Sequence, residues 1–148
     1  MSTDYTVTKA LIQTLEDGRK GFAKGAEQLM ENDEIKLAET FRAFETQRAE
    51  FAAELETLAA AYGDDIDESG SAVAAMHRGW MTVIDALSGS SADGVLGAAE
   101  TGESHTVGQY DQALLTEISP ELRDVISRQY GPVRNAHDTI AALSASSV

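Results

Sequence analysis

The chain has 148 residues, of which 43% are hydrophobic, so it can bury the core of a single folded domain, which we expect to span residues 1–148. It has no cysteine, which excludes disulfides and thiolate metal sites. A net charge of −14 argues against binding nucleic acid or an anionic membrane surface. The lack of a long apolar run and of a signal-peptide pattern predicts a cytoplasmic protein.

Apolar residues recur at steps of three and four along most of the chain, the spacing that predicts amphipathic helices. Strand-like alternation does not persist, and only two prolines occur. Ser119 and Pro120 have the residue types that cap and open a helix, whereas Pro132 lies inside a helical pattern and predicts a bend. In chain order we expect helices at about residues 6–31, 33–62, 72–88, 93–115 and 120–143.

The connection between the second and third long helices, residues 64–92, contains the shorter helix, which we expect to lie across the others. A long crossover makes the two long helices that it joins parallel. This connectivity is typical of ferritin-like bundles and differs from simple up-down-up-down bundles. The predicted fold is therefore all-α: a ferritin-like four-helix bundle whose long crossover carries a short fifth helix between helices two and three.

Charged and titratable side chains interrupt the apolar helix faces near mid-length. Arg48 stands in a row of Phe and Leu residues, and Glu103 and His137 hold similar places on later helices. Glu100 lies one turn before Glu103, and Asp17 lies at the edge of the first apolar face. A buried charge without a partner costs several kcal/mol, so these groups should pair with one another or with an ion.

The pattern of these residues can be compared with that of di-metal carboxylate bundles. Such bundles use a Glu from each of two helices and a Glu-x-x-His from each of the other two. Here the second helix has Glu45-x-x-Arg48 and the last has Arg134-x-x-His137, so arginine replaces one ligand on each. A guanidinium cannot bind a cation and would repel one.

We therefore expect Arg48 to take the place of a metal, holding the carboxylates of Glu100, Glu103 or both in a bidentate pair. His137 and Tyr110 would belong to the same polar network. In other interpretations Arg48 reaches solvent, Glu103 faces water, or His137 is an ordinary core histidine. A further alternative is a site for iron, manganese or zinc formed by Glu100, Glu103 and His137, with oxidase or storage chemistry.

A wider set of residues carries a resemblance to a known family. These residues are Asp17-Gly18-x-x-Gly21-Phe22, Arg48, Glu54-Leu55, Ser69-Gly70-Ser71, His77-Arg78-Gly79-Trp80, Gly102-Glu103, Tyr110 and His137-Asp138. Over about residues 6–143 the chain is similar to the ferritin-like four-helix-bundle proteins of the bacterial domain of unknown function 2383 family. The resemblance implies a ferritin-like bundle but no established reaction.

The crossover motif has residues of distinct chemistry. Trp80 lies on the apolar face of the short helix and should anchor that helix, and Gly79 permits a close backbone approach. His77 and Arg78 have the chemistry to bond carboxylates of a neighbouring helix or to form an anion pocket. His105 is expected to be exposed.

The sequence contains no phosphate-loop, dinucleotide or nucleophile-elbow motif. We therefore expect a non-catalytic structural or interaction module without a cofactor, in bacterial stress response, whose partner is a second copy or another protein. The alternatives are the metalloprotein described above and a carrier of a small ligand held between crossover and bundle.

Overall fold

The computed structural model describes residues 3–61, 71–87 and 89–146. Over these residues the protein is all-α, as predicted, and contains no strand. The crossover helix is present between the second and third long helices. The five helices are α1 (Thr3–Glu31), α2 (Ile35–Ala60), α3 (Ser71–Leu87), α4 (Ala92–Leu115) and α5 (Pro120–Ser146).

The helix ends follow local capping chemistry. The α1–α2 turn contains Asp33 at φ 61°, a left-handed conformation that stops α1. Ser119 accepts a hydrogen bond from the Leu122 N–H at 3.2 Å, as expected of a cap before Pro120. α1 begins three residues earlier than expected and α5 ends three later, because helix ends are weakly specified by periodicity. The expected helix ends at 62 and 88 lie outside the described residues.

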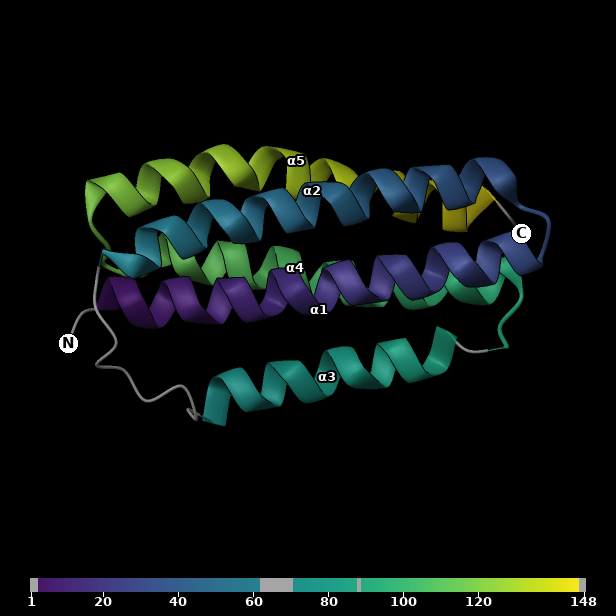
Figure 1. The fold of residues 1–148 in the computed structure, drawn as a ribbon, viewed down its shortest axis with the longest axis horizontal. Helices are drawn as coiled ribbons and strands as arrows, with labels where there is room; N and C mark the ends of the chain where they lie inside the picture. The colour runs from purple at the N-terminus through teal and green to yellow at the C-terminus, as the bar shows by residue number, and fades with distance from the viewer. Residues whose placement is uncertain (1–2, 62–70, 88, 147–148) are drawn as a thin grey trace.

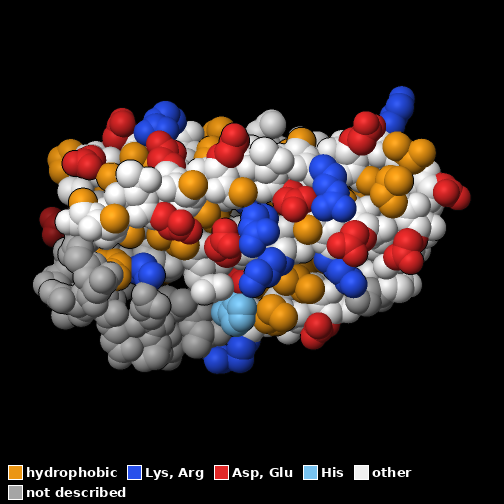
Figure 2. Space-filling view, viewed as in Figure 1, with side chains coloured by type: hydrophobic (Ala, Val, Ile, Leu, Met, Phe, Trp, Pro, Cys, Tyr) orange, Lys and Arg blue, Asp and Glu red, His pale blue; other side chains and the backbone are white. Residues whose placement is uncertain are grey.

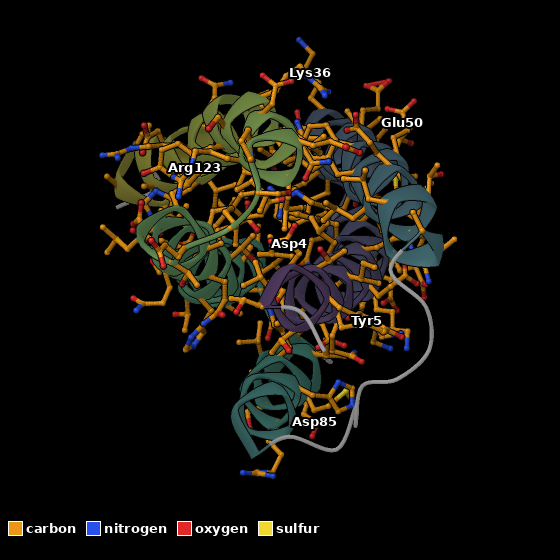
Figure 3. The ribbon with its side chains drawn as sticks, turned by 90° about the vertical axis from the view of Figure 1, so that its left-hand side faces the viewer. Asp4, Tyr5, Lys36, Glu50, Asp85 and Arg123 are labelled. Atoms are coloured by element: carbon orange, nitrogen blue, oxygen red, sulfur yellow. The ribbon has the colours of Figure 1, made fainter. Side chains whose placement is uncertain are left out.

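Four helices, α1, α2, α4 and α5, lie lengthwise beside one another, and α3 packs outside them against α1 and α4 (Figures 1 and 3). Helices α1, α3 and α5 run in one direction, whereas α2 and α4 run in the opposite one (Figure 1). The expectation that the crossover helix would lie across the others was wrong. It lies lengthwise against α1 and α4 (Figure 1), and Trp80, Val83 and Leu87, on successive turns, are buried there.

Two apolar clusters fill the two ends of the molecule. One contains Leu11, Leu15, Ala52, Leu55, Tyr110, Ala113, Leu122, Val125, Ile126 and Val133. The other contains Phe22, Ala26, Leu29, Ala38, Phe41, Leu87, Val95, Leu96, Ala99 and Ile140. Along α1, α2 and α4 the residues between the two clusters include the buried Asp17, Arg48 and Glu103. The core is therefore divided by a polar layer at mid-height.

The surface mixes acidic and basic side chains with small apolar areas on the face seen in Figure 2. Within the described ranges, no helix is long and apolar enough to cross a membrane.

Candidate functional site

The polar layer is centred on an ion pair between α2 and α4. Arg48 donates from Nη1 to Oε2 of Glu103 at 2.6 Å and from Nη2 to Oε1 at 2.5 Å. Both side chains are 0% exposed. This parallel two-bond geometry is the strongest form of an arginine–carboxylate contact, and it uses both oxygens of Glu103.

The remaining contacts of Arg48 complete its enclosure. Its Nε donates to Oε1 of Gln47 at 3.1 Å, and its Cζ lies 5.2 Å from the centre of the Phe22 ring. Phe22 in turn packs edge-on against Phe41, with 5.3 Å between ring centres, and at a tilt against Phe44, with 5.4 Å between ring centres. Both charged side chains are fully buried, so each charge of the pair depends on the other for compensation.

A second polar contact joins α1 to α3 at the edge of the layer. The carboxylate of Asp17 is 0% exposed and lies 2.9 and 3.0 Å from Nδ1 of His77, whose side chain is 42% exposed. Gln13 donates to Oδ1 of Asp17 at 3.0 Å. Burial raises the pKa of Asp17, and the bonds from His77 and Gln13 offset part of that rise. Asp17 is therefore held by the crossover helix rather than by Arg48.

Trp80 fills a slot lined by glycines on α1 and α4. A Cβ placed at Gly102 would lie 2.5 Å from the indole, and one placed at Gly21 would lie 2.9 Å away. The absence of these carbons lets α3 approach both helices closely. The indole is 2% exposed, and its Nε1 has no hydrogen-bond partner among the described residues. Trp80 thus anchors α3, as the sequence indicated.

The other crossover residues take different positions. Arg78 is exposed, so it adds no charge to the polar layer. Gly79 faces α4, where a Cβ on it would lie 4.0 Å from Nε2 of the exposed His105. Residues 69 and 70, which carried part of the resemblance, lie outside the described residues.

Tyr110 belongs to a third polar contact, between α4, α5 and α2. Its hydroxyl donates to Oε1 of Gln129 at 2.6 Å, and Gln129 donates to Oε1 of Glu54 at 2.9 Å. Burial raises the pKa of Tyr110, which keeps the phenol neutral. Hydrogen bonding from Gln129, followed by that from Arg128, lowers the pKa of Glu54. The chain Tyr110–Gln129–Glu54 connects the core to the surface without using Arg48.

His137 and Glu100 lie apart from the ion pair. His137 is half-buried, 3.2 Å from Oγ of Ser104 and 3.1 Å from Asp138, while its neighbour Ala136 holds the fully buried position. Glu100 is likewise half-buried beside the buried Ala99. The residues that we expected to form one polar network therefore form several separate contacts. The physical reason is that one residue turns a helix by about 100°, so an assignment that is off by one residue leaves the core.

The residues present do not fit a di-metal centre. Both oxygens of Glu103 are bound to Arg48, and Asp17 is bound to His77. In the described part of the chain no group of three or more His, Asp or Glu side chains is arranged to hold a metal ion. Glu100, Glu103 and His137, the alternative ligand set, do not form such a group.

Sequence reasoning did not identify some residues of these polar contacts. Gln129 is fully buried and stands three residues after Ile126 and four before Val133, a spacing that marks the inward face. That signal was available in the sequence. Gln13 gave no such signal, because its role depends on the position of α3. Arg134 is exposed and donates to the Tyr130 hydroxyl at 3.0 Å, away from the core.

Comparison with known protein families gives a match. The domain of unknown function 2383 family matches residues 6–116, three quarters of the chain. The match contains α2, α3, α4 and most of α1, and it ends before α5, so His137 and Asp138 lie beyond it. No curated protein matches the chain. Because the match covers three quarters of the sequence, the chain belongs to the domain of unknown function 2383 family.

Proposed function

We propose that the chain is a ferritin-like four-helix bundle in which an internal ion pair takes the place of a di-metal centre. In this proposal it serves as a non-catalytic structural or interaction module. The helix directions support the proposal: α2 and α4 run the same way and are joined through α3 (Figure 1). Ferritin-like bundles share this type of connection.

The observation that carries the proposal is the fully buried pair of Arg48 and Glu103. A metal centre needs free carboxylate oxygens and room for water or substrate. Here the guanidinium occupies both oxygens, and the ring of Phe22 lies over it. The pair links α2 to α4 across the interior of the bundle and leaves no free oxygen on Glu103 to bind a metal ion.

In the module that we propose, function resides in the outer surface, with a second copy or another protein as partner. The absence of cysteine from the sequence suits a reducing bacterial cytoplasm. The net charge of −14 disfavours nucleic acid and anionic membranes as partners.

Elemental analysis of protein purified without chelator tests this proposal. We expect iron, manganese and zinc far below one atom per chain, and no rise in the melting temperature when each metal is added. The variants Glu103→Ala and His137→Ala test the alternative ligand set, and Glu56→Ala, which removes an exposed carboxylate of α2, is the control. Stoichiometric metal that both test variants lose, and that the control retains, would overturn the proposal.

A further inference from the structure

The contact of His77 with Asp17 uses one ring nitrogen of the imidazole and leaves the other open. Nδ1 lies 2.9 and 3.0 Å from the two carboxylate oxygens of Asp17, and 42% of the histidine side chain is exposed. An ionised carboxylate only accepts hydrogen bonds, so Nδ1 donates. In a neutral imidazole the lone pair then lies on Nε2. Among the described residues Nε2 has no hydrogen-bond partner, so it is the nitrogen available for reaction.

The carboxylate of Asp17 is fully buried beside this ring. Burial raises its pKa, whereas the bonds from His77 and Gln13 and the charge of Lys20 each favour the ionised form. Gln13 donates to Oδ1 of Asp17 at 3.0 Å. The same amide lies 3.2 Å from Nδ1 of His77, farther than the carboxylate does, so the carboxylate sets the tautomer. A carboxylate in this place orients the ring and stabilises a positive charge that the ring gains.

The other two histidines of the chain lack this combination. His137 has a carboxylate near Nδ1, that of Asp138 at 3.1 Å, but its Nε2 lies 3.2 Å from Oγ of Ser104. His105 is exposed and forms no hydrogen bond to a carboxylate of the described residues. Of the three, His77 therefore joins a carboxylate on one nitrogen to an open second nitrogen.

Positive charges lie near this imidazole although the chain has a net charge of −14. Lys20 is exposed on α1, and its charge reaches Asp17. Arg78 is exposed and follows His77 directly on α3. Lys and Arg side chains also gather, among acidic ones, over the middle of α1 and α2 (Figure 2). Such charges favour the approach of a dianionic group.

We propose that Nε2 of His77 accepts a phosphoryl group from a phosphoramidate, which in the cell is a phosphorylated histidine of a partner protein. Histidine is an established nucleophile for covalent transfer, and Asp17 acts here as its positioning residue. The acceptor lies outside the pair of Arg48 and Glu103, so the inference does not depend on whether the centre of the bundle binds a metal.

The transfer exchanges one P–N bond for another. The lone pair of Nε2 attacks the phosphorus and forms the new P–N bond, while the donor nitrogen, which carries a positive charge, takes the old bonding pair and leaves as a neutral amine or imidazole. The ring of His77 gains the positive charge. That charge is compensated by the carboxylate of Asp17 at Nδ1, whose proton stays in place.

Incubation of the full chain with potassium phosphoramidate tests the acceptor. Intact-mass spectrometry should show the addition of one phosphoryl group, and peptide mapping should place it on His77. Phosphorus NMR distinguishes a phosphoryl group on Nε2 from one on Nδ1, and we expect the Nε2 form. His105 and His137 are internal controls and should react about tenfold more slowly, the order of effect that a carboxylate partner has on an imidazole.

Two variants separate an oriented nucleophile from a plain anchor of α3. His77→Gln should lose the modification. Asp17→Asn should react about tenfold more slowly and give a mixture of Nε2 and Nδ1 products, because nothing then fixes the tautomer. If Asp17 only holds α3 in place, its loss exposes the ring, and the rate should rise instead. Circular dichroism checks that both variants are folded, and the mapping on the wild-type chain needs no variant.

Two results would overturn the proposal. Equal phosphorylation of all three histidines would show that His77 is an ordinary exposed imidazole. An unchanged or faster reaction in Asp17→Asn, still on Nε2, would remove the positioning role of the carboxylate. Neither result bears on metal content, so failure here and failure of the proposed function are distinguishable.

Discussion

Replacing Arg48 by Leu tests the ion pair at the centre of the polar layer. The substitution removes two bonds of 2.5 and 2.6 Å and leaves the carboxylate of Glu103 buried. Breaking a buried pair in this way costs about 3–5 kcal/mol of unfolding free energy. Glu103→Gln leaves the guanidinium buried instead, and we expect a similar loss of about 3 kcal/mol.

The double variant Arg48→Leu/Glu103→Gln distinguishes a true pair from two independent side chains. With both charges gone, the remaining cost is that of a neutral polar group and a changed cavity, about 2–3 kcal/mol. The double variant should therefore lose at least about 2 kcal/mol less than the sum of the single variants.

Urea unfolding followed by circular dichroism measures these differences from the midpoint and slope of each curve. An osmolyte in all samples keeps the single variants folded at the start of the titration. The control cycle uses Arg42→Leu and Glu45→Gln, a pair on α2 at 2.9 Å whose side chains are 50% and 25% exposed. Its coupling should be about 0.5 kcal/mol or less. If the Arg48 and Glu103 effects add to within about 0.5 kcal/mol, the two charges do not depend on each other and the reasoning fails.

Three further predictions concern the surroundings of this pair. Gly102→Ala should lower stability by about 1–3 kcal/mol, because its Cβ would lie 2.5 Å from the indole of Trp80. Gly108→Ala is the control on the same helix: it has open space around it and should raise stability by about 0.5–1 kcal/mol. Equal effects of the two substitutions in urea unfolding would contradict the close packing of Trp80 on Gly102. Asp17→Asn should gain stability relative to the wild type as the pH rises from about pH 4. The raised pKa means that the protonated Asp17 stabilises the wild type fully below the unfolded pKa, and that this contribution is lost as the pH rises through the folded pKa. If urea unfolding gives the same stability difference between variant and wild type at every pH, the argument is wrong. Tyr110→Phe should cost about 1–2 kcal/mol by leaving Oε1 of the buried Gln129 without its donor, and an unchanged midpoint would show that the bond adds nothing.

Much of the helical framework could be predicted from residue spacing. The expected helices overlap the observed ones, and the capping Ser119 lies where its type and the following proline predicted. The short helix predicted in the long crossover is also present, with Trp80 on its inward face. These features are local, because they depend on periodicity of 3.6 residues and on capping chemistry within a few positions.

The sequence by itself determined that Arg48 and Glu103 lie near the middle of inward helix faces, where a charge needs a partner. Only the tertiary structure decided which partner each group has: Glu103 rather than Glu100 for Arg48, and His77 rather than Arg48 for Asp17. Periodicity gives the face of one helix to within about a residue. Partner choice depends on the rotation and axial shift of one helix against another, which packing of the whole core sets.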